Sequence, residues 1–280
     1  MEWYEAVLLG LIQGLTEFLP VSSSGHLEIG KVLLGVETTD DLLFTTMVHA
    51  ATVLSTILVF RKQIWDLLKG FFCGLKGIRI EKGALVCNDQ TDYLLKIVVS
   101  MIPIFVVGVF FKDQVESLFG SIMVVGVALV VTAALLFFSD MASKPRKNAK
   151  ENTYRNGISY WRAFVIGIGQ SIAVIPGLSR SGTTISTGLI CGVKREAMAQ
   201  FSFLMVLAPI LGEMFLNIVK GEVVFASIGV VPMLAGFISA FIVGCLACKF
   251  MIGIVKRGKL IWFAVYCAVA GVVSIVSNFM

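Results

Sequence analysis

The stretch that decides the fold is "QGLTEFLPVSSSGHLEIG", residues 13–30, which interrupts an apolar region over 3–36. A second apolar region, 160–193, is interrupted in the same way by "IPGLSRSGTT" at 175–184. The fragments beside each break are too short to cross the hydrocarbon core comfortably, which takes about 20 helical residues. Such breaks are tolerated at membrane depth only where protein or a water-filled cavity satisfies the freed backbone groups. We therefore expect two re-entrant helix–loop–helix hairpins.

The composition indicates an all-α polytopic membrane protein. Of 280 residues, 57% are hydrophobic and 15% are charged, and the mean hydropathy is +0.91. A soluble domain of this length would carry far more charge. The net charge of +5 does not indicate nucleic-acid binding, because the basic residues lie in short loops between apolar runs. The remaining runs predict six full spans, at 42–60, 93–111, 119–138, 200–219, 225–248 and 260–278.

The distribution of lysine and arginine predicts the orientation of the chain. Six such residues lie in 61–91, six in 139–162 and four in 249–259. If the two hairpins do not cross, all three segments fall on one side, which should be the cytoplasm, and both termini lie outside. The stretch "GIRIEKGALVC" in the first of these segments is consistent with a short β-hairpin. The acidic N-terminus, "MEWYEAVLLG", does not resemble a cleavable signal peptide.

The chain also repeats itself at a constant offset of 157 residues over about 45 positions. Each half contains one hairpin and three spans, and because three is odd the second half must be inverted. We expect a first repeat over 1–138, a cytoplasmic linker over 139–158 and an inverted repeat over 159–280. In such folds the functional site lies near the midplane, where the broken segments meet. The identical pairs include Gly10/Gly167, Gln13/Gln170, Ser22/Ser179, Ser24/Ser181, Gly25/Gly182, Gly35/Gly192, Val36/Val193, Phe44/Phe201, Ala51/Ala208 and Leu54/Leu211.

Positions that differ between the two breaks point to chemistry rather than scaffold. Glu17 corresponds to Val174, Ser23 to Arg180, and His26 to Thr183. An ionisable group inside a membrane is a functional candidate by default, because it is costly unless it faces a cavity or a partner. We infer that two similar hairpins have diverged to contribute different groups to one shared site.

Together these groups predict an anion cradle. Helix N-termini near Gly25 and Gly182 would direct backbone amides and positive dipole ends at the midplane. Arg180 adds a bidentate fork suited to phosphate oxygens. Glu17 and His26 add an acid/base pair, or a carboxylate for a divalent cation. The predicted binding residues are Gln13, Ser22, Ser24, Gly25, Ser179, Ser181, Gly182 and Thr184.

Structural roles are the alternatives to this interpretation. Glu17 and Arg180 would then form a plain ion pair, and His26 would cap a helix. Ser22 and Ser24 suit caps because their repeat mates are also serines. Packing or pairing with a neighbouring element is the expected role of His49, Glu213 and the C-x-x-C pair Cys245 and Cys248.

The motifs "QGLTEFLPVSSSGH" and "PGLSRSGTT", with the "AQFSFLM" that follows, resemble the undecaprenyl-diphosphate phosphatases of the bacitracin-resistance type. The resemblance implies a hydrolase of the bacterial inner membrane that removes the terminal phosphate of undecaprenyl diphosphate. It would regenerate the monophosphate carrier for peptidoglycan synthesis and confer bacitracin resistance. It also implies a divalent cation, Mg²⁺ or Ca²⁺, and a polyprenyl diphosphate lipid as partner beside the membrane lipids. A homodimer is compatible with this resemblance.

The family's motifs match this chain at most of their polar positions. Many relatives carry glutamate at the position of Gln13, so the acidic motif here keeps one carboxylate, Glu17, as the expected metal ligand. The nucleophile is either Ser23, activated by His26 or Glu17, or a water activated by the same pair. We expect the site to open to the outer face. A polyprenyl-phosphate transporter using the same cradle is the alternative function. The matching residues are Gln13 and Glu17, then Ser22, Ser23 and His26, then Ser179, Arg180 and Thr184.

Overall fold

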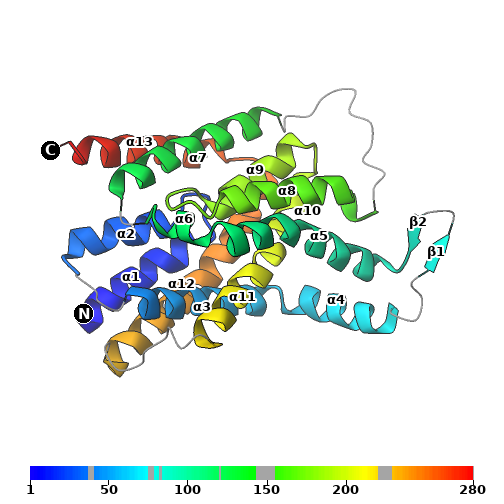
Figure 1. Cartoon of the computed structure of the whole chain (residues 1–280), viewed down its shortest axis with the longest axis horizontal. Helices are drawn as coiled ribbons and strands as arrows, with labels where there is room; N and C mark the ends of the chain where they lie inside the picture. Colours follow the sequence, from blue (N-terminus) through cyan, green and yellow to red (C-terminus); the bar gives the residue numbers. More distant parts are fainter. Residues whose placement is uncertain are drawn as a thin grey trace.

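The protein is a bundle of helices with one small β-hairpin (Figure 1). The structure, a computed structural model, describes residues 1–36, 41–74, 79–81, 84–119, 121–142, 155–219 and 229–279. The elements are α1 Trp3–Thr16, α2 Ser23–Leu34, α3 Asp41–Val59, α4 Arg61–Gly74, β1 Arg79–Glu81, β2 Ala84–Val86, α5 Asp89–Phe110, α6 Lys112–Glu116, α7 Ile122–Ala142, α8 Tyr160–Ile172, α9 Arg180–Ile190, α10 Arg195–Met205, α11 Leu207–Val219, α12 Val230–Arg257 and α13 Ile261–Ser277.

The chain is a polytopic membrane protein. Within the described ranges, α5, α7, α12 and the α10–α11 unit are long and apolar enough to cross a membrane, and the bent pair α3–α4 raises the number to five. Both interrupted regions are helix–break–helix units, α1–α2 and α8–α9, as predicted. Each of the six predicted spans coincides with a helix or a helix pair over its described residues, but α3 and α13 are short, so six crossings stay a prediction.

Three helix boundaries differ from the sequence-based prediction. The helix predicted over 225–248 continues as α12 to Arg257, and Gly258 ends it in a left-handed conformation with φ 72°. Most of the predicted loop 249–259 is therefore helical. A short break at Val206 divides the predicted span 200–219 into α10 and α11. The start of the predicted loop 61–91 is a helix, α4, which bends from α3 by 76°.

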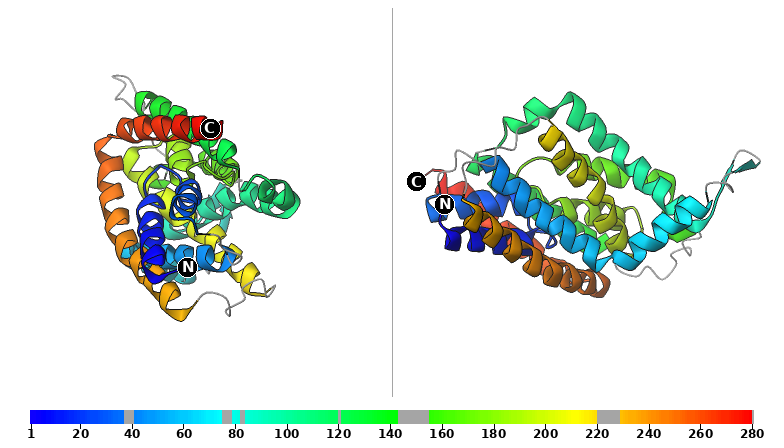
Figure 2. Two further views of the ribbon diagram at one scale, coloured as in Figure 1. Left: turned by 90° about the vertical axis from the view of Figure 1, so that its left-hand side faces the viewer. Right: turned by 90° about the horizontal axis from the view of Figure 1, so that it is seen from below.

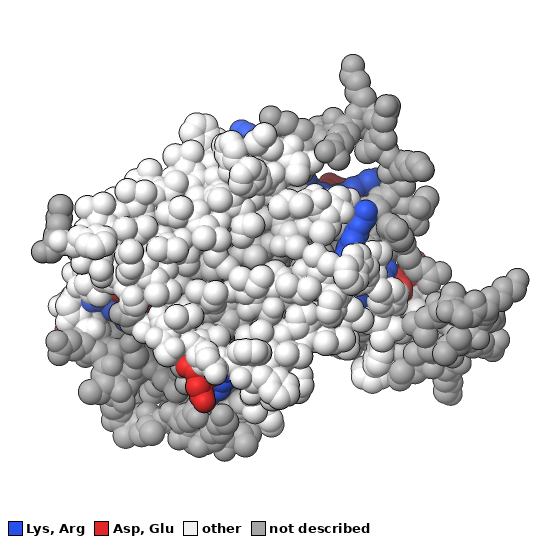
Figure 3. Space-filling model, turned by 45° about the horizontal axis from the view of Figure 1, so that its top comes forward, with Lys and Arg blue, Asp and Glu red and all other residues white. Residues whose placement is uncertain are grey.

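The predicted β-hairpin is confirmed, since β1 pairs antiparallel with β2. It lies at the end of the molecule opposite to both termini (Figures 1 and 2). On the face drawn in Figure 3, a broad area between the two ends carries no charged side chain. A broad uncharged area is what a bilayer requires of a surface that contacts its hydrocarbon core. Most of the predicted linker 139–158 lies outside the described residues.

Helix packing exchanges partners between the two halves of the chain. The first helix, α1, lies beside α12, and α8 lies beside α5 (Figure 1; Figure 2). Both contacts depend on glycine: a Cβ at Gly10 would lie 2.3 Å from the carbonyl oxygen of Gly236, and one at Gly167 would lie 2.3 Å from that of Ser100. Gly10 and Gly167 are 157 residues apart, so corresponding positions make corresponding contacts. This exchange brings both helix breaks to the centre of the bundle.

Candidate active site

Each break ends in a serine that caps the following short helix. Ser22 Oγ accepts a hydrogen bond from the Gly25 amide at 3.2 Å, and Ser179 Oγ accepts one from the Gly182 amide at 3.1 Å. This is the usual N-cap geometry, in which a side-chain oxygen satisfies an amide of the first turn. The capping role expected for Ser22 is therefore confirmed. The Gly25 and Gly182 amides donate to these caps in this structure, and the binding of an anion at the two helix N-termini stays a prediction.

The start of each short helix packs against the break of the other half. A Cβ at Gly25 would lie 3.2 Å from Gly177 Cα, and one at Gly182 would lie 3.2 Å from Pro20 Cβ. Ser24 Oγ accepts a hydrogen bond from the Gly177 amide at 3.5 Å. Ser181 Oγ donates to the Leu19 carbonyl at 3.3 Å. The glycines thus permit close approach, and the serines join one hairpin to the other.

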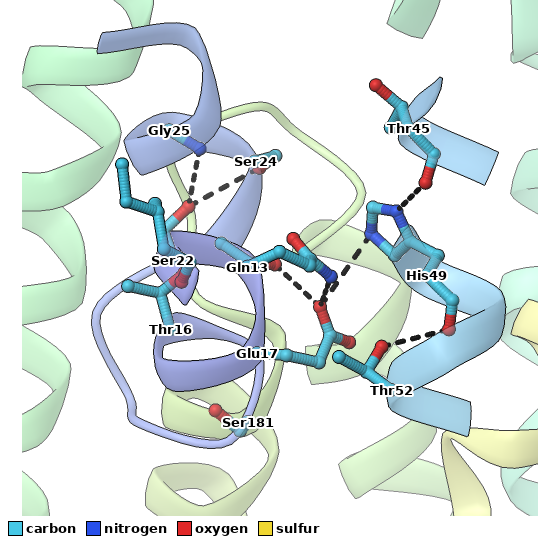
Figure 4. Close-up of polar contacts among 12 residues, drawn as sticks. Gln13, Thr16, Glu17, Ser22, Ser24, Gly25, Thr45, His49, Thr52 and Ser181 are labelled. Atoms are coloured by element: carbon cyan, nitrogen blue, oxygen red, sulfur yellow. Dashed lines mark hydrogen bonds and ion pairs between the residues drawn. The ribbon is translucent and has the colours of Figure 1, made fainter. Parts of the chain in front are cut away.

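Glu17 lies at the centre of a polar cluster beside the first break (Figure 4). Gln13 Nε2 donates to its Oε2 at 2.9 Å, and Ser23 Oγ donates to the same oxygen at 2.7 Å. The Gln13–Glu17 contact confirms that the two residues share one face of α1. Hydrogen bonds to an ionised carboxylate are the strong ones, so this geometry holds Glu17 in one orientation. It also leaves the Ser23 hydroxyl aligned on a proton acceptor.

Glu17 and Arg180 line two cavities. The first is polar, and its other lining residues are Thr16, Ser23, Ser24, His49, Ala173, Leu178 and Ser179. Among the described residues, the Nε and Nη1 of Arg180 are buried without a hydrogen-bond partner. No direct ion pair joins Arg180 to Glu17 in the described part of the chain, so the plain ion-pair alternative is not observed. A buried guanidinium without an acceptor is prepared for an anionic ligand.

The second cavity is also lined by these two residues and is mostly apolar. Its walls come from the first break, α3, α9, α10 and α11, and the break at Val206 contributes to them. Ser181 and Ser202 are among its few polar residues. The apolar lining is formed by Phe18, Val53, Phe203, Val206, Leu207 and Ile210. The site therefore joins a polar chamber to an apolar one across Glu17 and Arg180.

Two predicted site residues face elsewhere. His26 Nε2 lies 2.6 Å from the Tyr266 hydroxyl and its ring stacks on Tyr266 of α13, while Nδ1 bonds the Ser22 carbonyl. No hydrogen bond joins His26 to Ser23 among the described residues, so the predicted activation of Ser23 by His26 is not observed. Thr184 Oγ1 pairs with Ser202 Oγ at 2.6 Å and lines neither cavity. Helix geometry turns both side chains away from the break.

His49 is the residue that sequence reasoning missed. It lies on α3, its Nε2 is 3.7 Å from Glu17 Oε2, and it lines the polar cavity (Figure 4). The expected hydrogen bond is present, because Nδ1 lies 2.8 Å from the Thr45 carbonyl, but the residue is not mere packing. A signal was available: 157 residues on from His49 stands Val206, so this position differs between the halves as Glu17 does.

The other structural alternatives are met only in part. Cys245 and Cys248 are free cysteines on α12 and Cys248 is buried, as expected of packing residues. The side chain of Glu213 lies outside the described residues, so its pairing stays a prediction.

Comparison with known proteins settles the family. The family model described as bacitracin resistance protein BacA matches residues 6–273. This chain belongs to that family. It is 54% identical to an undecaprenyl-diphosphatase of Bacteroides fragilis, over 99% of this chain and 98% of the relative. It is 53% identical to one of Bacteroides thetaiotaomicron, over 99% and 100%, and 36% identical to one of Korarchaeum cryptofilum, over 97% and 98%. The relatives give the transporter alternative no support.

Proposed function

We propose that this chain is an undecaprenyl-diphosphatase. It hydrolyses undecaprenyl diphosphate to undecaprenyl phosphate and inorganic phosphate, as the names of its full-length relatives indicate. The observation that carries the proposal is that Arg180, whose buried Nε and Nη1 have no partner among the described residues, lies on one polar cavity with the Ser23–Glu17 pair. Phosphoryl transfer depends mainly on positioning and on electrostatic stabilisation, and these groups provide both.

The two chambers suit the two parts of the lipid. The diphosphate would occupy the polar cavity, where its oxygens accept from the Arg180 Nε and Nη1 that otherwise lack a partner. The first isoprenoid units would occupy the apolar cavity beside Phe18, Phe203 and Leu207. A fork of donors matches two phosphate oxygens at once, which a lysine would not do.

Ser23 is the nucleophile we favour. Its hydroxyl donates to Glu17 Oε2 at 2.7 Å, so the carboxylate takes the proton as the oxygen attacks the terminal phosphorus. The bond to the bridging oxygen breaks, and undecaprenyl phosphate leaves with the proton returned by Glu17. The regenerated Glu17 carboxylate then deprotonates a water that attacks the phosphoserine, which releases inorganic phosphate as Ser23 takes the proton back. The alternative is one step, in which a water held by Glu17 attacks directly.

A divalent cation, Mg²⁺ or Ca²⁺, belongs to this proposal. No group of three His, Cys, Asp or Glu side chains within the described ranges makes a complete metal site. Glu17 fits as a partial one, because no hydrogen bond reaches its Oε1 among the described residues. Magnesium commonly takes one or two carboxylates and completes its shell with substrate phosphates and water. When bound, the cation would neutralise charge on the transferring phosphoryl group.

We further propose an inverted-topology repeat with two re-entrant hairpins in the bacterial plasma membrane. The reciprocal contacts of Gly10 and Gly167, and of Gly25 and Gly182, support it because they occur at the 157-residue offset. Both termini lie at the end opposite the β-hairpin (Figure 2), and we place that end outside the cell, with the site open to the outer face.

The test is phosphate release from undecaprenyl diphosphate by purified protein in detergent, with Mg²⁺, with Ca²⁺ and with EDTA. We expect cation-dependent release by the wild type and near-complete loss in Arg180→Ala. Arg61→Ala is the matched control, because Arg61 is exposed at the start of α4 and, within the described ranges, its side chain bonds only the Leu58 carbonyl of α3. A folded wild type that releases no phosphate under any of these conditions would contradict the proposal.

A further inference from the structure

The orientation of the His49 ring is fixed by the backbone of its own helix. Its Nδ1 lies 2.8 Å from the Thr45 carbonyl oxygen, and a carbonyl oxygen only accepts, so Nδ1 must carry the hydrogen. In the neutral ring Nε2 then carries a lone pair. That lone pair points toward Glu17, whose Oε2 is 3.7 Å away (Figure 4).

Two acceptors therefore face each other across a gap that is too wide for a hydrogen bond. A normal N–H···O bond measures about 2.7–3.2 Å. Oε2 already accepts from Gln13 and Ser23, and neither donor approaches His49 Nε2 in the hydrogen bonds of the described residues. A positively charged species between the imidazole and the carboxylate would relieve this opposition.

The gap has dimensions that suit a metal ion. Nitrogen and oxygen ligands lie about 2.0–2.2 Å from zinc or magnesium, so one ion can contact two atoms up to about 4 Å apart. The hydrogen bond from Nδ1 to a backbone carbonyl is the second-shell contact that orients metal-binding histidines. Both side chains line the same polar cavity, where the diphosphate would lie under the proposed function.

We propose that His49 Nε2 and the Glu17 carboxylate are joint ligands of the divalent cation. The inference rests on the proposed function for the presence of a cation, and it adds a nitrogen ligand from α3 where the acidic motif offers only one carboxylate. Diphosphate oxygens and water complete the shell. Because imidazole suits transition metals better than calcium, the site should prefer Mn²⁺ or Co²⁺ to Ca²⁺. Arg180, the other charged group that lines this cavity, keeps the affinity modest until an anionic substrate is present.

The probe is Mn²⁺ bound to purified full-length protein, followed by electron paramagnetic resonance without substrate. The chain has two histidines, His26 and His49, so labelling histidine with ¹⁵N reports on these two sites alone. We expect a ¹⁴N hyperfine coupling to Mn²⁺ that changes to a ¹⁵N coupling in the labelled protein. His49→Gln should abolish the coupling and weaken Mn²⁺ binding at least about tenfold.

His26→Gln is the matched control and should keep the coupling, because its ring faces Tyr266. Glu17→Gln should weaken Mn²⁺ binding as His49→Gln does. A coupling that survives in His49→Gln, or Mn²⁺ binding that this variant leaves unchanged, would overturn the assignment. The gap would then hold a proton shared by the imidazole and the carboxylate. If either result is found in His49→Gln while the wild type still releases phosphate, the ligand assignment fails and the proposed function stands. If the wild type shows the coupling but releases no phosphate, the ligand assignment stands and the proposed function fails.

Discussion

The two helix breaks share a frame and differ in chemistry. Ser22 and Ser179 cap the following helices at 3.2 and 3.1 Å, and Gly35 and Gly192 end those helices with positive φ angles. On this frame the first break carries a carboxylate and a serine, Glu17 and Ser23. The second carries Val174 and Arg180 at the corresponding positions.

The proton-accepting carboxylate and the hydrogen-bond-donating guanidinium therefore lie in opposite halves of the chain. A negative group on one hairpin and a positive group on the other both face one polar cavity, yet they form no direct ion pair among the described residues. Had both halves kept the same residues, two like charges would face the same polar cavity. Divergence of the two breaks therefore makes a site that either hairpin alone would lack.

Substitution of Arg180, the positive group of the second break, should have the largest effect on phosphate release. Arg180→Ala deletes the buried donors that have no other partner, and we expect phosphate release to fall by about 1,000-fold or more, as for other arginines in phosphoryl transfer. Arg180→Lys keeps the charge without the fork and should recover only a small part of the rate. Steady-state phosphate release measures both. Normal turnover in Arg180→Ala would contradict the proposal that Arg180 binds the substrate's phosphate oxygens.

Substitution of Ser23, which donates to Glu17, tests the chemistry of the first break. Ser23→Ala removes the hydroxyl that donates to Glu17, and we expect turnover to fall by about 100-fold or more if the covalent route operates. Rapid-quench analysis with ³²P-labelled substrate should trap a phosphoserine in the wild type and none in the variant. Ser22→Ala, which loses a helix cap instead, is the control for stability. Near-normal turnover in Ser23→Ala would leave only the direct attack by water.

Because Gly10 and Gly167 occupy corresponding positions, substituting either should destabilise the protein by a similar amount. Alanine at Gly10 or at Gly167 would press into a backbone carbonyl oxygen at 2.3 Å, and each should destabilise the protein by about 1–3 kcal/mol. Thermal unfolding in detergent measures this, and the two shifts should be similar. Gly108→Ala is the control, since a Cβ there would contact nothing, and it should be neutral or stabilising. Unequal shifts would argue against corresponding roles for the two glycines.

The smallest effect should come from the paired glutamines. Gln13 donates to Glu17, so Gln13→Leu should lower phosphate release by about tenfold. Gln170 is fully buried, and neither amide atom has a hydrogen-bond partner among the described residues. Gln170→Leu should therefore leave phosphate release within about twofold and keep or raise the melting temperature. A large loss of activity in this variant would show that the second break also contributes chemistry.

The sequence alone predicted the frame of the site because local patterns control it. Serine before a short helix and glycine after it are local signals, and the 157-residue offset placed both breaks correctly. The four-residue spacing of Gln13 and Glu17 was enough to place both on one face of α1. These features need no knowledge of which helices become neighbours.

What escaped prediction depends on tertiary packing. His26 and Ser23 are close in sequence, but α13 approaches the first turn of α2 and Tyr266 takes the His26 ring. His49 reaches Glu17 because α3 packs near α1, a contact that no periodicity in either segment indicates. The helix α4, which follows α3 after a bend of 76° where a loop was expected, was likewise not predicted.

The exchange of packing partners between the halves also sets an order of assembly during synthesis. Helix α1 leaves the ribosome well before its main neighbour, α12, is made. Contacts so distant in sequence are slow to form and leave early segments exposed meanwhile. More than two hundred residues must therefore be synthesised after Glu17 before α12, against which α1 packs, is present. Catalytic competence is then among the last properties that the growing chain acquires.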